Sequence, residues 1–132
     1  MKKNLFSFTI TLFAVFAANE SFSQVNILPN NATIPGLIEA GDTVICSNNN
    51  TFFLNGKVYV QSGGQIVIGQ GTNIKGVKKP TPAEASALVI CRGGSIDCQG
   101  TNTNPAVFTS AEPVPHVGDW GGVVLLGSAP LN

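Results

Sequence analysis

Apolar and polar positions alternate in short segments along the chain, and two of these segments match each other at a fixed spacing. Residues 58–68 (VYVQSGGQIVI) and residues 88–98 (LVICRGGSIDC) share the order of strand, Gly-Gly corner and strand, with an offset of 30 residues (58 to 88). Alternation with a period of two is typical of β-strands, and a whole unit that recurs at one spacing is typical of a solenoid. The pattern therefore predicts an all-β fold that coils as a parallel β-helix. We expect Val58 to stack on Leu88, Val60 on Ile90, Ile66 on Ile96, and Ile68 on Cys98.

The repeat also divides the rest of the chain. Two proline-containing segments, 76–86 and 110–119, interrupt the alternation and are predicted to be loops inserted at corners of the coil. A small antiparallel sandwich is the alternative fold, because Gly-Gly pairs also suit hairpins. The coil interpretation predicts strands at 51–54, 57–61, 65–69 and 73–75, then at 87–91, 95–98 and 106–109, with 120–127 opening another rung.

The N-terminus has the features of a secretory signal peptide. Two lysines precede an uncharged apolar run at 5–18, which is shorter than the roughly 20 residues that a membrane-spanning helix needs. We predict a signal peptide over 1–23 with cleavage after Ser23, and cleavage after Ala17 or a retained anchor are the alternatives. Residues 24–50, rich in turn-forming residues, then form an N-terminal lead-in or cap, and residues 51–132 form a partial β-helix.

Charge is sparse and balanced. The chain has 7 Lys and Arg against 7 Asp and Glu, which argues against nucleic acid as a partner because phosphate binding needs a concentrated basic face. After the predicted signal peptide, Lys75, Lys78 and Lys79 form the only run of one sign. Because prolines follow directly, a solvated loop is the favoured interpretation, and a polyanion-binding patch is the alternative.

Three cysteines follow the predicted signal peptide, and the strand pattern predicts a different environment for each. Cys98 matches the inward Ile68 of the first copy, so we expect a small buried side chain. Cys91 matches the polar Gln61 and should point outward, which disfavours a bridge to Cys98. A disulfide between Cys91 and Cys46, in a loop-like segment, stays open, and the odd count leaves at least one free thiol in a monomer.

Four ordered blocks carry a resemblance to a known family. The series 53–76, 87–101, 105–113 and 118–132 resembles the N-terminal rungs of secreted bacterial proteins with a pectin-lyase-like right-handed β-helix, including type IX secretion sorting-domain proteins. The resemblance covers 51–132 and implies about three rungs of a right-handed helix. It also implies export to the surface or surroundings of a Gram-negative bacterium, but no agreed activity. The pattern stops within a rung, so we expect a fragment or truncated reading frame whose full-length form has further C-terminal rungs or a sorting domain.

Candidate chemistry is limited. Pectin-lyase-like enzymes use clustered carboxylates, a calcium ion or a basic residue, but Asp97 stacks over Val67, and one isolated carboxylate does not divide acid and base roles. No C-x-x-C pair occurs and the single histidine, His116, lies in a loop, so we predict no catalytic, metal or cofactor site.

Four residues are candidates for contact with a surface carbohydrate: Asp97, Arg92, Asp119 and Trp120. Each also has a structural interpretation. Asp97 suits a surface position near a corner, Asp119 suits a turn cap, and Trp120 suits packing under the preceding loop. Asp42-Thr43-Val44 resembles a short bacterial O-glycosylation pattern with Thr43 as the acceptor.

These observations favour an exported, non-catalytic β-helix segment that serves as a structural scaffold or binds extracellular polysaccharide or cell-surface components. One alternative is the N-terminal part of an extracellular polysaccharide lyase or hydrolase. Another is a truncated, non-functional remnant.

Overall fold

The computed structural model describes residues 22–128, so the predicted signal peptide lies almost wholly outside the described residues. Within this range the chain forms eleven strands and one short 3-10 helix, and no described helix is long and apolar enough to cross a membrane. The strands are β1 (Gln24–Leu28), β2 (Leu37–Ile38), β3 (Asp42–Cys46), β4 (Thr51–Leu54), β5 (Lys57–Val60), β6 (Gln65–Ile68), β7 (Asn73–Gly76), β8 (Ala87–Ile90), β9 (Ser95–Cys98), β10 (Val107–Ser110) and β11 (Gly122–Leu125), and the 3-10 helix is η1 (Pro82–Glu84).

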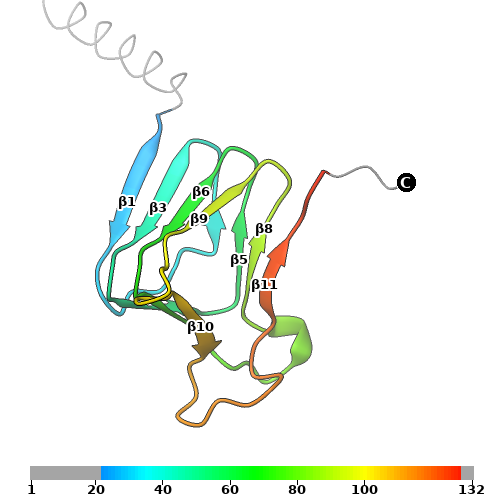
Figure 1. The fold of residues 1–132 in the computed structure, drawn as a ribbon. Helices are drawn as coiled ribbons and strands as arrows, with labels where there is room; N and C mark the ends of the chain where they lie inside the picture. The colour runs from blue at the N-terminus through cyan, green and yellow to red at the C-terminus, as the bar shows by residue number, and fades with distance from the viewer. Residues whose placement is uncertain (1–21, 129–132) are drawn as a thin grey trace, which may run out of the picture.

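The strands build three parallel sheets that the chain visits in turn (Figure 1). One sheet has the order β1-β3-β6-β9, the second β10-β7-β4, and the third β11-β8-β5-β2. We call them the first, second and third sheets. Every strand pair is parallel, because the chain completes a full turn before it returns to the same sheet. The protein is therefore a parallel β-helix, as the repeat predicts.

The register confirms the stacking expected from the 30-residue offset. In the third sheet Val58 pairs with Leu88, and the next turn continues the column with Val123. In the first sheet Ile66 pairs with Ile96. The remaining predicted pairs are Val60 with Ile90 and Ile68 with Cys98, and both are present.

The segment 24–50 is more regular than its composition suggests. It contains β1, β2 and β3, which pair in parallel with each other or with later strands. Strand β2 has only two residues, too few for alternation to be visible in the sequence. Cys46 ends β3 and is not in a loop, which corrects the sequence interpretation.

The core fills the inside of the coil. Alternate residues of each strand point inward, so β4, β6 and β7 each show a strict alternation of half-buried and buried positions. The largest fully buried side chains include Phe52, Ile34, Leu54, Ile66 and Ile74. Because columns of such residues continue from turn to turn, each turn covers the apolar face of its neighbour.

Both Gly-Gly corners have the same physical cause. The first glycine of each pair, Gly63 or Gly93, has a φ of 82° or 80°, a conformation that costs other residues energy. The second has no room for a side chain. A Cβ on Gly94 would lie 2.5 Å from the carbonyl oxygen of Val60.

The cysteine environments differ from the prediction. Cys98 does stack on Ile68, yet it is exposed, because no described strand pairs with the outer edge of β9. The buried thiol is instead that of Cys46, and burial raises its pKa to about 12. All three cysteines, including Cys91, are free thiols.

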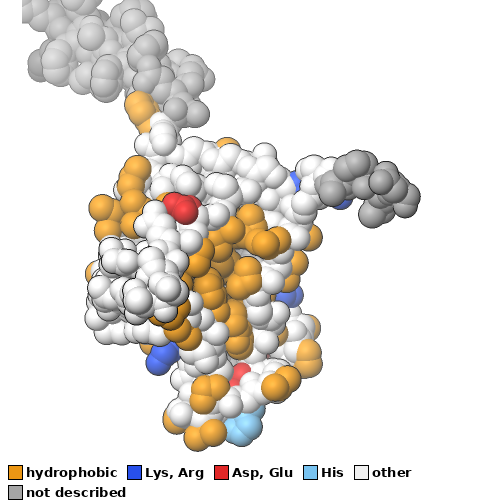
Figure 2. Space-filling view, viewed as in Figure 1, with side chains coloured by type: hydrophobic (Ala, Val, Ile, Leu, Met, Phe, Trp, Pro, Cys, Tyr) orange, Lys and Arg blue, Asp and Glu red, His pale blue; other side chains and the backbone are white. Residues whose placement is uncertain are grey.

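Apolar side chains are uncovered at this end of the coil. Figure 2 shows hydrophobic side chains gathered in the region between β9 and β11. Ile96 is only half-buried there, and Leu125 of β11 is 66 % exposed. In the last described turn, a side chain can therefore point inward and still be exposed.

Candidate functional site

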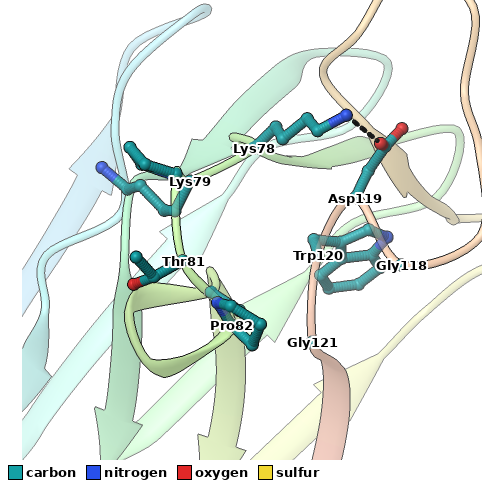
Figure 3. Close-up of a pocket in the computed structure, with 10 residues that line it drawn as sticks. Lys78, Lys79, Thr81, Pro82, Gly118, Asp119, Trp120 and Gly121 are labelled. Carbon is teal, nitrogen blue, oxygen red and sulfur yellow. Dashed lines mark ion pairs between the residues drawn. The ribbon is translucent and has the colours of Figure 1, made fainter.

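A half-open cavity of about 450 Å³ lies between the two inserted loops (Figure 3). Residues 78–82 and Ala85 line one side, and residues 118–121 line the other. We call this cavity the insertion cleft. Its volume falls within the range of about 300–1,000 Å³ that is usual for small-molecule sites.

The topology explains why the two loops meet. The first loop connects β7 to β8, and the second connects β10 to β11. Both therefore leave the second sheet and enter the third, on successive turns of the coil. Loops at equivalent corners of neighbouring turns lie next to each other, just as the strands do.

Ser86 anchors the base of the first loop. Its buried hydroxyl donates a hydrogen bond to the carbonyl oxygen of Val77 (2.6 Å) and accepts one from the N–H of Gly56 (2.9 Å). The carbonyl oxygen of Ser86 accepts a hydrogen bond from the N–H of Gly121 at 2.7 Å. A single residue thus closes the first loop and joins it to the second.

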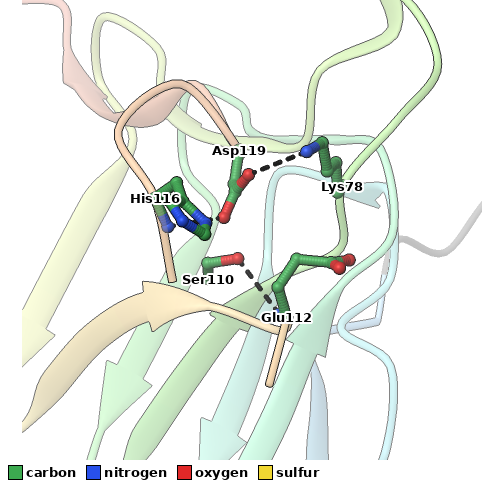
Figure 4. A network of polar contacts seen from close by, with 5 residues as sticks. All are labelled: Lys78, Ser110, Glu112, His116 and Asp119. Atoms are coloured by element: carbon green, nitrogen blue, oxygen red, sulfur yellow. Dashed lines mark hydrogen bonds and ion pairs between the residues drawn. The ribbon is translucent and has the colours of Figure 1, made fainter. Parts of the chain in front are cut away.

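An ion pair joins the loops at the other end of the cleft (Figures 3 and 4). The Nζ atom of Lys78 lies 3.2 Å from Oδ1 of Asp119, whose side chain is only 2 % exposed. The other oxygen, Oδ2, accepts a hydrogen bond from the N–H of His116 at 2.8 Å. This backbone hydrogen bond, together with Ser110 and Lys78, lowers the pKa of Asp119 below its ordinary value, although burial acts in the opposite direction.

Lys79 contributes its stem and not its charge to the cleft. Its ammonium donates a hydrogen bond to the side-chain oxygen of Asn55, and in Figure 3 it points away from the cavity. Thr81, on the same side, donates its hydroxyl to Oε2 of Glu84 at 2.8 Å. The polar groups of this wall are thus largely occupied by partners within the protein.

Trp120 forms the opposite wall. Its inner part packs closely on Gly76, where a Cβ atom would lie 2.6 Å from Cβ and Cγ of the tryptophan. Its ring borders the cavity across from Thr81 and Pro82 (Figure 3). The packing against the backbone fixes the indole while part of it stays accessible.

The structure brings together two of the four predicted contact residues. Asp119 and Trp120 are neighbours in the insertion cleft, whereas neither Asp97 nor Arg92 lines it. Arg92 is exposed at the corner between β8 and β9. Asp97 is exposed on β9, stacks over Val67 as expected, and accepts a hydrogen bond from Gln99 at 2.9 Å.

Thr43 occupies a central strand. It is half-buried in β3, between Val25 of β1 and Gln65 of β6.

The sequence interpretation missed the cleft residues of the first loop, Lys78 to Pro82, because it treated the loop as solvated. A usable signal was present. Both insertions follow the third strand of a rung, so the repeat itself indicates that they share one corner.

Across the described range 22–128, no group of three or more His, Cys, Asp or Glu side chains could hold a metal ion.

Comparison with known proteins identifies the family. A family model described as a pectate-lyase-like beta helix domain matches residues 36–132, well over half of the 132 residues. A search of curated proteins and a search of solved structures each found no match. The match covers β2 to β11 and both inserted loops, and β1 lies before it. The chain therefore belongs to the pectate-lyase-like β-helix domain family.

Proposed function

We propose that this protein is an exported, non-catalytic β-helix scaffold that binds extracellular polysaccharide in the insertion cleft. The observation that carries the proposal is the position of Trp120, whose indole is fixed by Gly76 on one side and borders a cavity of about 450 Å³ on the other. An aromatic ring held in this way offers an apolar plane on which a sugar ring can stack without a large loss of side-chain entropy.

The surroundings of Trp120 support binding more than acid–base catalysis. Among the described residues, Asp119 is the single carboxylate that lines the cleft. It is paired with Lys78 and accepts a hydrogen bond from the N–H of His116. Glycoside hydrolysis ordinarily divides acid and base or nucleophile roles between two carboxyl groups on opposite sides of the bond. A cleft wall with one carboxylate that is already paired with a lysine does not supply that arrangement.

The export part of the proposal rests on the N-terminal sequence. A short basic start and an apolar run at 5–18 have the order of a secretory signal peptide. Separation of cells into cytoplasmic, periplasmic, surface and medium fractions tests this part. Detection of the intact, unprocessed chain in the cytoplasm alone would contradict it.

The tryptophan supplies a direct assay for binding. Trp120 is the only tryptophan of the chain, so its tryptophan emission reports on the cleft. We expect a saturable change in emission when the purified protein is titrated with soluble oligosaccharides drawn from several polysaccharide classes. Trp120→Phe keeps an aromatic ring and should retain weakened binding in calorimetry, whereas Trp120→Ala should abolish it.

A matched control separates the cleft from the rest of the surface. Tyr59 is a partly exposed aromatic residue on the outer face of β5 and does not line the cleft. Tyr59→Ala should bind as the unmodified protein does. Loss of binding in Tyr59→Ala with retention in Trp120→Ala would move the site to the outer face of the third sheet and overturn the proposal.

The second candidate function is the N-terminal part of an extracellular polysaccharide lyase or hydrolase. It is favoured by the family's resemblance to pectate lyases and by Asp97, which is exposed on the last described strand of the first sheet. Release of reducing ends or of unsaturated products from a polysaccharide, lost in Asp97→Asn, would support this candidate over the scaffold.

A further inference from the structure

The insertion cleft holds little uncompensated charge, although two lysines line it. Lys78 is paired with Asp119 at 3.2 Å, and the ammonium of Lys79 is turned toward Asn55, outside the cavity. Among the described residues that line the cleft, the exposed cation, Lys78, is therefore already paired with a carboxylate.

The buried carboxylate adds to this effect. The side chain of Asp119 is 2 % exposed and belongs to the cleft wall. Its hydrogen bonds lower its pKa, so it is ionised at neutral pH. An anion that approached Lys78 would have to compete with this carboxylate, which lies 3.2 Å from the ammonium.

What remains accessible is mostly apolar. Trp120 lies on one side, and the opposite side is formed by Pro80, Pro82, Ala85 and the aliphatic stem of Lys79. The hydroxyl of Thr81 is already bonded to Glu84. Such walls suit a ring whose two faces carry C–H groups and whose hydroxyls point outward to water.

On the basis of the proposed function, we infer that the insertion cleft selects uncharged pyranose rings with apolar faces, such as those of a β-1,4-glucan, and rejects uronate rings. The ion pair of Lys78 and Asp119 is the element that sets this preference. The carboxylate of Asp119 compensates the positive charge of Lys78, which would otherwise attract the carboxylate of a uronate.

The test uses two ligands that differ only in the group at C6, which is neutral in one and charged in the other. A β-1,4-glucan tetramer and a β-1,4-glucuronan tetramer share the same linkage and ring geometry, and differ in having CH₂OH or a carboxylate at C6. Titrations followed by Trp120 fluorescence and by calorimetry, at low and at high salt, should give at least tenfold tighter binding of the glucan, with little dependence on salt.

Two variants test the role of the ion pair. Asp119→Asn keeps the side-chain shape, removes the negative charge and releases the charge of Lys78. We expect it to bind the glucuronan more tightly than the unmodified protein does, in a salt-sensitive manner. The double variant Lys78→Gln, Asp119→Asn removes the released charge and should again reject the glucuronan. Thermal unfolding of each variant establishes that it is folded. Lys75→Gln is the control, because Lys75 lies on β7 and does not line the cleft, and its glucan binding should be unchanged.

The outcomes separate this inference from the proposed function. Equal or tighter binding of the glucuronan by the unmodified protein, weakened by salt, would overturn the inference and leave polysaccharide binding in place. An Asp119→Asn variant that is folded and keeps the original preference would also overturn it. Absence of binding by any oligosaccharide of either kind would overturn both.

Discussion

Lys78 and Asp119 form an ion pair that joins two loops from successive turns of the coil. The two residues are separated by β8, β9 and β10, yet their side-chain atoms lie 3.2 Å apart. Because the loops otherwise meet mainly through Ser86 and Gly121, the ion pair holds the outer part of the insertion cleft together.

Acid should loosen this connection. The pKa of Asp119 is lowered in the folded protein, so its ionised form contributes stability above the unfolded pKa of about 3.9. That contribution is lost as the pH falls from this value through the lower folded pKa. We expect the unfolding temperature to fall below about pH 4 more steeply in the unmodified protein than in Asp119→Asn. Parallel curves for the two proteins would contradict the prediction.

The second glycine of each corner should tolerate no side chain. In Gly94→Ala the new Cβ would lie 2.5 Å from the carbonyl oxygen of Val60, so the backbone must shift. We expect a loss of about 2 kcal/mol or more in the free energy of unfolding, measured with chemical denaturant. Gly56→Ala is the comparison, because it has a φ of 100° and open space around it, and it should lose only about 1–2 kcal/mol through backbone strain. Equal stability of Gly94→Ala and the unmodified protein would exclude the predicted clash.

Reactivity should distinguish the cysteines. Cys46 is buried with a pKa of about 12, so its thiol stays protonated and inaccessible in the folded state. Cys98 is exposed and should be alkylated first, with half-buried Cys91 slower. Mass spectrometry of peptides after brief alkylation measures the order. Labelling of Cys46 at the rate of Cys98 would mean that the coil opens readily or that β3 is not buried.

Two isoleucines in one column should differ in their contribution to stability. Ile66 and Ile96 are paired in register and both point inward, but Ile66 is fully buried and Ile96 is half-buried. We expect Ile66→Ala to cost about 2–5 kcal/mol and Ile96→Ala less than half as much. Denaturant unfolding of the two variants gives the comparison, and a larger loss in Ile96→Ala would contradict the exposure of this end of the coil.

The sequence contains most of the strand register because equivalent residues in successive turns are chemically similar. Val58 and Leu88 are both aliphatic and both inward, and their 30-residue offset is enough to place one on the other. The exposure of Cys98 could not be predicted from the same pattern. Alternation gives the direction of a side chain, whereas burial depends on whether another strand covers it.

The candidate site was predictable only in part. Asp119 and Trp120 stand out in the sequence as a carboxylate and an aromatic residue before a Gly-Gly pair, but Lys78 resembles any lysine of a solvated loop. Its partner is decided by the packing of two loops from different turns, and no local pattern encodes such a contact. The sequence did indicate that the two loops lie next to each other, because both insertions occupy the same corner of successive turns.

That shared corner allows one wall of the cleft to be replaced without changing the sheets. The strands end at β7 and β10 before the loops begin, and the chain returns to the sheets at β8 and β11. Residues 78–82 could therefore be exchanged for other segments, because the hydrogen bonds of Ser86 to Gly56 and Val77 still hold the base of the loop. The binding specificity of the cleft can therefore change through the sequence of one loop, while the strands that carry it stay the same.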